Sequence, residues 1–228
     1  WDQLNNEGSF VKPTGTPSTY LKGNCLETKD VESSKFCHPA VFFDVMGRYL
    51  ETDSVVCADI GDNSLWLASS LAAKRGQRFL SSEHLGIMGY SLNSALAASL
   101  SALHKANLTG GSVPKTLVIA GDGGIQMSLN ELATLKDQGA NNVLVVVIVN
   151  GRLGRVQNET WGPRVRADGC HVGSPDFVKL FDAYSYPNGL SISTSDPQVI
   201  ADTIESGWRS AEQNGCCVVE LHQDEHIH

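Results

Sequence analysis

The chain has 228 residues, of which 41% are hydrophobic and 18% are charged. This composition supports a sizeable core in one large or two small domains and excludes a mainly disordered chain. Acidic residues outnumber basic ones by 25 to 17, for a formal net charge of -8. Since the sequence has no Lys/Arg cluster and no apolar run near the ~20 residues of a membrane span, we expect neither a nucleic-acid partner nor a bilayer span. The result is a soluble, acidic, globular protein, at first sight a poor host for an anionic ligand.

The first residues differ in composition from the rest. Residues 1–36 are polar, rich in Gly, Ser, Thr, Asn and Pro, and lack sustained periodicity, which is typical of a linker or an extended arm. Residues 37–228 carry the periodic patterns and are expected to form one domain. Because the chain starts at Trp1 rather than Met, we also expect a segment upstream that includes any targeting peptide.

The six cysteines favour an intracellular protein. None of them forms a CxxC pair, so neither a zinc site nor a thioredoxin-like site is indicated. Cys216 and Cys217 fall in a strand-like run, where neighbouring side chains point to opposite faces. We therefore expect buried free thiols, in the cytosol or in an organelle matrix.

Hydrophobic periodicity predicts helices and strands in alternation along most of the chain. In chain order, the predicted elements are a helix over 40–50, a strand over 54–59, a helix over 85–104, a strand over 116–120, a helix over 129–137, a strand over 143–149, a helix after 174–176, a helix from 197 to about 215, and a strand over 217–221. The strands are continuous apolar runs, which indicate a parallel sheet covered on both faces. The predicted fold class is therefore α/β, a doubly wound, mostly parallel sheet with helices on both faces.

Cap signals predict where three of these helices begin. Ser128, with Glu131 three residues later, matches a capping box. Pro175 stands between Ser174 and Asp176, and Pro197 follows Asp196. Each proline is therefore expected in the first turn of its helix.

Three polar segments follow predicted strands, at 59–63, 121–124 and 150–152. Ligands of open α/β sheets gather beyond the carboxyl ends of the strands. A right-handed crossover would place the strands before Asp122 and Asn150 side by side, ~4.8 Å apart. We therefore expect these two side chains to converge, although 28 positions separate them.

A carboxylate, an amide oxygen and a loop carbonyl form a hard, all-oxygen set of ligands. Such a set suits Mg²⁺ that keeps water and phosphate oxygens, rather than zinc. The glycines beside Asp122 allow backbone N–H groups to approach a phosphate without interference from a Cβ. These residues predict a diphosphate that is held through a magnesium ion.

These segments also resemble a known family. Gly121-Asp122-Gly123 followed by Asn150 resembles the thiamine-diphosphate motif, which runs from GDG to a paired Asn-Asn. Residues 121–134, 59–66 and 85–90 resemble segments of the acetolactate synthase, pyruvate oxidase and pyruvate decarboxylase group. The resemblance covers about residues 39–222 and implies the C-terminal, diphosphate-binding domain of that group, with thiamine diphosphate and Mg²⁺ as cofactors.

The resemblance implies a role for each matching residue. Asp122 and Asn150 would be magnesium ligands through their side chains, and Arg152 through its carbonyl. The other residues that it assigns to the cofactor are Gly121, Gly123 and Gly124 at the diphosphate, Gly61, Asp62 and Asn63 at its far side, Gly86 with a carbonyl toward the aminopyrimidine, and Met88 under the thiazolium ring.

The chain departs from the family pattern at several positions. Val149 stands where the family has the first Asn of its pair, and one extra residue lies between Asp122 and Asn150. Asn93 replaces a proline, and an insertion over 107–113 lengthens the loop before the cofactor strand. None of these changes removes a residue expected to bind the metal.

Candidate catalytic residues lie near the motif. Glu159 stands nine residues after Asn150, where pyruvate-oxidase-like members carry a glutamate, and is a candidate acid or base on the substrate side. His84 precedes the Gly86 turn and is the second candidate. A solvated loop charge is the alternative for Glu159. Arg155 and Arg166 are candidates for a substrate carboxylate, with a surface role as the alternative.

The implied function is part of an enzyme that decarboxylates a small 2-oxo acid and then protonates, oxidises or ligates the product. The family requires a glutamate on a pyrimidine-binding domain, so a further domain or subunit and an oligomer are expected. FAD occurs in a middle domain of several relatives, and this sequence offers no support for it. The alternative is a non-catalytic subunit that binds the cofactor or acts as a scaffold in a larger assembly.

Overall fold

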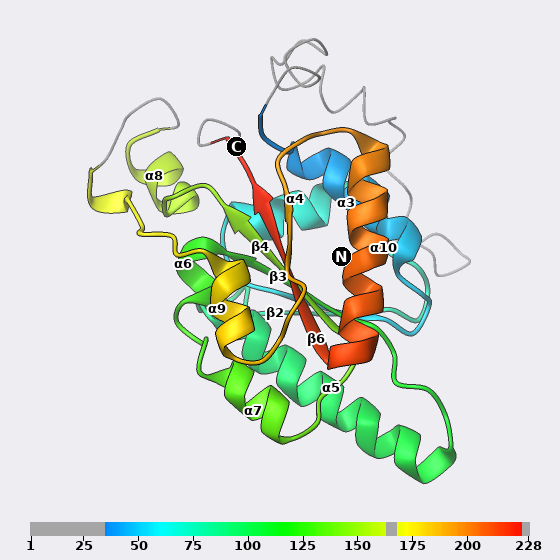
Figure 1. Ribbon diagram of the computed structural model, residues 1–228. Helices are drawn as coiled ribbons and strands as arrows, with labels where there is room; N and C mark the ends of the chain where they lie inside the picture. Colours follow the sequence, from blue (N-terminus) through cyan, green and yellow to red (C-terminus); the bar gives the residue numbers. More distant parts are fainter. Residues whose placement is uncertain (1–34, 163–167, 225–228) are drawn as a thin grey trace.

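The computed structural model describes residues 35–162 and 168–224 (Figure 1). The arm predicted over residues 1–36 lies almost wholly outside the described residues. Within the described ranges, six strands form one parallel sheet in the order β2-β1-β3-β4-β6-β5. The strands are β1 (Val55–Ala58), β2 (Arg78–Ser81), β3 (Thr116–Gly121), β4 (Val143–Val149), β5 (Leu190–Ile192) and β6 (Cys216–His222).

Helices cover both faces of the sheet, which confirms the predicted doubly wound α/β fold (Figure 1). One face carries α3 (Pro39–Tyr49), α4 (Asp62–Ser70) and α10 (Pro197–Asn214). The other face carries α5 (Tyr90–Thr109), α7 (Glu131–Asp137) and α9 (Phe177–Ala183). Two short helices, α6 (Asp122–Ile125) and α8 (Gly154–Thr160), and a 3₁₀ turn at Asp168–Cys170 lie in loops.

The central strand β4 shows why its sequence is apolar without alternation. Leu144, Val146 and Ile148 pack into the core under α3, α4 and α10. Val143, Val145 and Val147 pack into the core under α5, α7 and α9. Every residue of the strand up to Ile148 is therefore buried against a helical layer, as expected for a parallel sheet.

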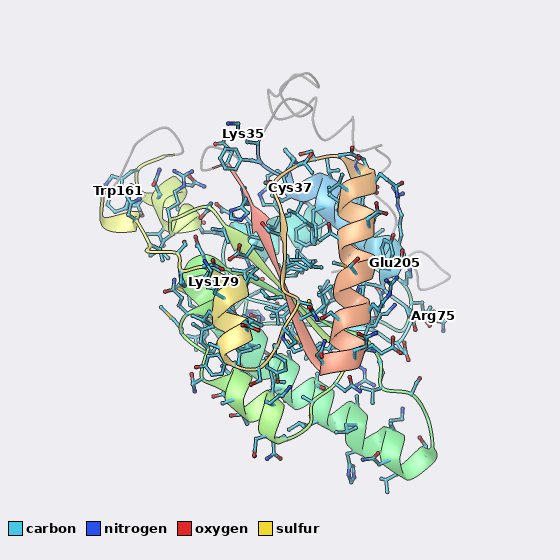
Figure 2. All side chains as sticks on the ribbon, viewed as in Figure 1. Lys35, Cys37, Arg75, Trp161, Lys179 and Glu205 are labelled. Atoms are coloured by element: carbon cyan, nitrogen blue, oxygen red, sulfur yellow. The ribbon has the colours of Figure 1, made fainter. Side chains whose placement is uncertain are left out.

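The cysteines follow the same two-sided pattern. Cys217 lies in the first of these cores and Cys216 in the second. Each of the five cysteines in the described residues is a buried free thiol, as predicted, whereas Cys25 lies outside them. Charged side chains such as Arg75, Lys179 and Glu205 lie at the periphery of the molecule (Figure 2). In the described ranges, no helix is both long enough and apolar enough to cross a bilayer.

The structure corrects one predicted helix and adds elements that periodicity did not reveal. The helix predicted from residue 85 begins only at Tyr90, because Gly86 and Gly89 adopt positive φ angles of 68° and 83° in the preceding turn. The strands β2 and β5 are only 4 and 3 residues long, too short for a recognisable period. Helix α4 was not predicted either.

Two of the three cap predictions were wrong. Asp196 accepts a hydrogen bond from the Gln198 amide and Pro197 begins α10, as expected. The capping box fails, because Ser128 Oγ has no hydrogen-bond partner and the N-cap of α7 is Asn130. Asp176 is the N-cap of α9, so Pro175 precedes the helix instead of lying in its first turn.

Because β4 is buried on both faces, truncation of one of its side chains should destabilise the fold. Leu144→Ala should lower the free energy of unfolding by about 2–5 kcal/mol, because it opens a cavity beneath the helix layer. Leu108→Ala is the matched control, since Leu108 is 74% exposed and its truncation should cost less than about 0.5 kcal/mol. Urea unfolding of both variants measures the difference, and equal losses would contradict the described core.

Candidate active site

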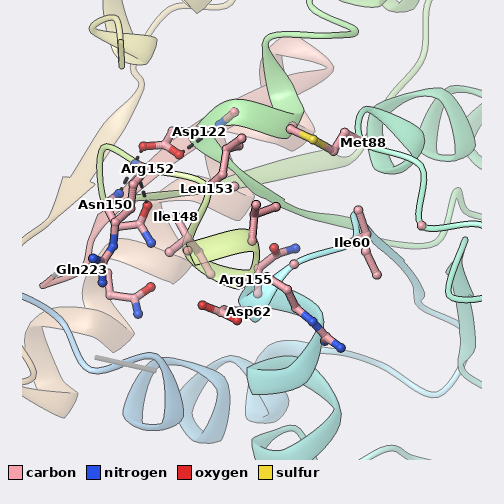
Figure 3. Close-up of a pocket in the computed structure, with 18 residues that line it drawn as sticks. Ile60, Asp62, Met88, Asp122, Ile148, Asn150, Arg152, Leu153, Arg155 and Gln223 are labelled. Carbon is pink, nitrogen blue, oxygen red and sulfur yellow. Dashed lines mark hydrogen bonds between the residues drawn. The ribbon is translucent and has the colours of Figure 1, made fainter. Parts of the chain in front are cut away.

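A pocket of about 220 Å³ lies at the carboxyl edge of the sheet (Figure 3). It is bounded by the segments that follow β1, β3 and β4, together with the turn before α5. Every residue that the resemblance assigned to the cofactor or the metal lines this pocket: Gly61, Asp62, Asn63, Gly86, Met88, Gly121, Asp122, Gly123, Gly124, Asn150 and Arg152. The remaining lining residues are Ile60, Ile148, Leu153, Gly154, Arg155, Val156 and Gln223.

The loops that carry Asp122 and Asn150 meet at the end of the sheet, and both residues line the pocket. Strands β3 and β4 are hydrogen-bonded neighbours, with Gly121 opposite Ile148. Beyond that pair, Asp122 Oδ2 accepts hydrogen bonds from the backbone N–H groups of Asn150 and Gly151, at 3.2 and 2.7 Å. The two segments therefore meet through direct contacts at the end of the sheet.

The Asp122 carboxylate is buried, with the residue only 1% exposed. Burial raises the pKa of this carboxyl above its usual range. Hydrogen bonds from Ser174, Gly151, Gly123 and Asn150 oppose that shift, because they favour the charged form. These donors favour the ionised form of a carboxylate that burial alone would disfavour.

The glycines of α6 bring the backbone close to side chains of neighbouring segments. A Cβ at Gly123 would lie 2.9 Å from Leu153 Cδ2 and 3.3 Å from Met88 Cε. A Cβ at Gly124 would overlap the carboxylate of Asp59. The backbone can pack this closely at these two positions only because neither residue has a side chain.

Asp59 begins the polar segment 59–63 that the sequence pointed to, although no role was predicted for it. It is fully buried at the end of β1 and does not line the pocket. Its Oδ1 accepts a hydrogen bond from the Ser91 amide at 2.6 Å, and its Oδ2 accepts one from the Gly89 amide at 3.0 Å. Burial raises the pKa of this carboxyl. Asp59 therefore joins the turn that carries Met88 to the glycines of α6.

The opposite wall of the pocket is formed by α4 and α8. Asp62 opens α4, and its Oδ2 accepts a hydrogen bond from Asn158 Nδ2 of α8 at 3.0 Å. A Cβ at Gly154 would lie 2.8 Å from the same oxygen, so the two helices are closely packed there. Asn63 donates from Nδ2 to the Asp59 carbonyl at 2.9 Å and stabilises the loop from within.

The two candidate catalytic residues lie outside the pocket lining. Glu159 pairs with Arg155 across one turn of α8, with 2.6 Å between Oε1 and Nε, and Arg155 does line the pocket. His84 is exposed in the turn before Gly86. Arg166 lies outside the described residues. The catalytic roles of both residues stay predictions.

The ligand set of the pocket fits a hard cation. Asp122 Oδ1 accepts one hydrogen bond, from the Gly123 amide at 2.9 Å, and Asn150 Oδ1 accepts one from the Arg152 amide at 3.2 Å. Each oxygen can accept a further ligand, because an sp² oxygen has two lone pairs. Carboxylate, amide and backbone oxygens are the ligands that Mg²⁺ prefers.

Comparison with known proteins identifies the fold family. The family described as "Thiamine pyrophosphate enzyme, C-terminal TPP binding domain" matches residues 59–221, which include every residue that lines the pocket except Gln223. The chain belongs to this family.

Its curated relatives include acetolactate synthases. The chain is 27% identical over 188 residues to the acetolactate synthase large subunit of Lactococcus lactis, covering 78% of this chain and 30% of the relative. It is 28% identical over 213 residues to the isozyme 3 large subunit of Escherichia coli, covering 90% and 34%. A probable large subunit of Methanocaldococcus jannaschii is 34% identical over 162 residues, covering 67% and 25%. The matches thus span between 25% and 34% of the length of these relatives.

The contact between Gly124 and Asp59 makes a second prediction. Gly124→Ala should lower the free energy of unfolding by about 1–3 kcal/mol, because the new Cβ must displace a carboxylate held by two hydrogen bonds. Thermal and urea unfolding of the unliganded chain measure the loss.

Gly47→Ala is the matched control for this substitution. Gly47 lies inside helix α3, and a Cβ added there would have no neighbouring atom within 4 Å, so alanine should raise stability by about 0.5–1 kcal/mol. Equal effects of the two glycine substitutions would contradict the packing of Gly124 on Asp59.

Proposed function

We propose that this chain forms the part of a thiamine-diphosphate site that holds the diphosphate through Mg²⁺. The enzyme would act on a small 2-oxo acid, as in a decarboxylase, carboligase or oxidase resembling acetolactate synthase. One observation supports this most strongly: the Asp122 carboxylate meets the Asn150–Arg152 loop beside the glycines of α6, in a chain of this family.

Each group of pocket residues has a proposed task. Asp122 and Asn150 would hold the cation through Oδ1 atoms that still have a free lone pair, and Arg152 through its carbonyl. Gly121, Gly123 and Gly124 would present backbone to the diphosphate. The far side of the pocket, at Gly61, Asp62 and Asn63, would border it.

The residues of the turn before α5 would orient the organic part of the cofactor. Gly86 and Met88 line the pocket, and the methyl group of Met88 approaches Gly123. Asp59 holds this turn in place through the Gly89 amide. When bound, thiamine diphosphate supplies a nucleophilic carbon and accepts the electron pair left when a 2-oxo acid loses CO₂.

We further propose that a pyrimidine-binding domain or subunit covers this pocket and contributes the activating glutamate. Leu85 and Ile87 flank Gly86 in the turn before α5, Met127 lies shortly after α6, and the three side chains are 79%, 44% and 63% exposed. Large apolar side chains gathered beside a site favour contact with another protein surface. We also propose an assembly of two or more subunits, and no task in the proposal needs FAD.

Glu159 and His84 are proposed as groups that act on the substrate from the rim of the pocket. Arg155 connects Glu159 to the pocket, and its guanidinium is suited to a substrate carboxylate. Arg155→Lys would keep the positive charge but lose the planar, bidentate geometry, and should therefore weaken binding of the substrate carboxylate.

The thermal stability of the chain tests the proposed site. Thiamine diphosphate and Mg²⁺ at about 100 times their dissociation constant should stabilise the chain by about 2.7 kcal/mol, or roughly 5–10 °C in Tm. Asp122→Ala should abolish the increase, and removal of Mg²⁺ with EDTA should reverse it. Asp137→Ala, on the exposed surface of α7, should leave the increase unchanged.

Two outcomes would contradict parts of the proposal. No change in the Tm of the wild-type chain at saturating cofactor would contradict the site itself. Cofactor binding without 2-oxo acid turnover, with a pyrimidine-binding domain of the family added, would instead support the alternative of a non-catalytic subunit.

A further inference from the structure

We propose that Ser174 is a positioning residue for the metal site: its hydroxyl holds one oxygen of Asp122 and leaves the other for the cation. This inference rests on the proposed function. Ser174 Oγ donates to Asp122 Oδ2 at 2.6 Å. In the part of the chain that the structure describes, it is the one side chain that donates to this carboxylate.

The two oxygens of Asp122 have different surroundings. Oδ2 accepts hydrogen bonds from Ser174 Oγ and from the amides of Asn150 and Gly151. Oδ1 accepts one, from the amide of Gly123. A carboxylate oxygen has about two lone-pair sites, so three donors saturate Oδ2 while Oδ1 keeps one site. The cation therefore binds Asp122 through Oδ1 alone.

The segment that carries Ser174 is anchored on the same loop that completes the site. Residues 170–172 run antiparallel to residues 151–153, with hydrogen bonds from the Leu153 amide to the Cys170 carbonyl and from the Val172 amide to the Gly151 carbonyl. These bonds are 2.8 and 2.9 Å long. The backbone beside Ser174 is thus tied to the Asn150–Arg152 loop.

Two further contacts fix the position of Ser174. Gln126 Nε2 donates to the carbonyls of Asp122 and Gly173, at 2.8 and 3.0 Å, and joins α6 to this segment. On the far side, the Phe177 amide donates to Glu220 Oε1 at 2.6 Å, which anchors the start of α9 on β6. Ser174 is itself exposed, so its hydroxyl adds little to the core. Its contribution is to the orientation of the Asp122 carboxylate.

Binding of Mn²⁺, a spectroscopic substitute for Mg²⁺, tests this role in the full chain. The free Mn²⁺ signal in electron paramagnetic resonance is titrated in the presence of saturating thiamine diphosphate. Ser174→Ala should weaken Mn²⁺ binding by about 10–100-fold, the usual cost of losing a residue that orients a metal ligand. Ser174→Thr keeps the hydroxyl and should stay within a few-fold of wild type.

Two controls separate positioning from general stability. Ser101→Ala, on the exposed surface of α5, should change neither Mn²⁺ affinity nor Tm. Loss of a hydrogen bond to a buried carboxylate should lower the Tm of unliganded Ser174→Ala by a few degrees, so Mn²⁺ is titrated at a temperature where both chains are folded, and the loss of affinity must persist there.

Each result of the titration decides one question. Wild-type affinity in Ser174→Ala, or a loss in Ser174→Thr as large as in Ser174→Ala, would overturn the role of Ser174. A wild-type chain that binds no Mn²⁺ with thiamine diphosphate present would overturn the proposed function and this inference with it.

Discussion

The site depends on the pairing of β3 with β4. These strands run parallel with Gly121 opposite Ile148, so the chain leaves the sheet at neighbouring points after Gly121 and Val149. Asp122 then accepts the Asn150 and Gly151 amides, and this contact joins the two loops. A register shift of one residue would turn Asp122 away from the loop, since successive side chains of a strand point to opposite faces. Such a shift would exchange Leu144 and Ile148 with smaller valines between the two cores, and this mismatch in packing opposes it.

Two buried carboxylates at strand ends, those of Asp59 and Asp122, accept hydrogen bonds that connect the loops around the pocket. Asp59 uses its oxygens on the Gly89 and Ser91 amides and does not line the pocket. Asp122 uses one oxygen in the same way and, under our proposal, offers the other to a cation. The difference follows from position, because β1 ends beside the turn before α5 and β3 ends beside the Asn150 loop.

If a cation and backbone N–H groups hold the diphosphate, the acidic composition of the chain is compatible with this anionic ligand. The net charge of -8 describes the whole surface, whereas the proposed diphosphate contacts are a cation and backbone N–H groups. A bound Mg²⁺ would be the largest local charge in the pocket and would reverse the sign that Asp122 alone gives to it.

The long strands and helices were predictable because their hydrophobic patterns extend over many residues. The run Val143–Val149 is apolar at every position and rich in β-branched residues, which favours a buried parallel strand. The short strands β2 and β5 lacked that signal, and β2 is partly exposed at the edge of the sheet. The start of α5 was misplaced because apolar residues at 85, 87 and 88 resemble a helix period, although two glycines with positive φ hold a turn there.

The site was predictable from the sequence only where residues face the pocket. The family motif located Asp122, Asn150 and the glycines, and all of them line the pocket. Asp59 and Ser174 act through hydrogen bonds to other residues, and their partners lie 30 and 52 positions away. A single sequence carries no sign of such contacts, although a carboxylate directly after a buried strand was a signal that could have suggested a role for Asp59.

The central claim is that the loops after β3 and β4 together bind the cofactor. Amide chemical shifts of the isotope-labelled chain, measured before and after addition of Mg²⁺ and thiamine diphosphate, test it most directly. The account predicts the largest shifts at Gly123, Gly124, Asn150 and Gly151, with little change along α10. Shifts confined to other regions, or none at saturating cofactor, would contradict it.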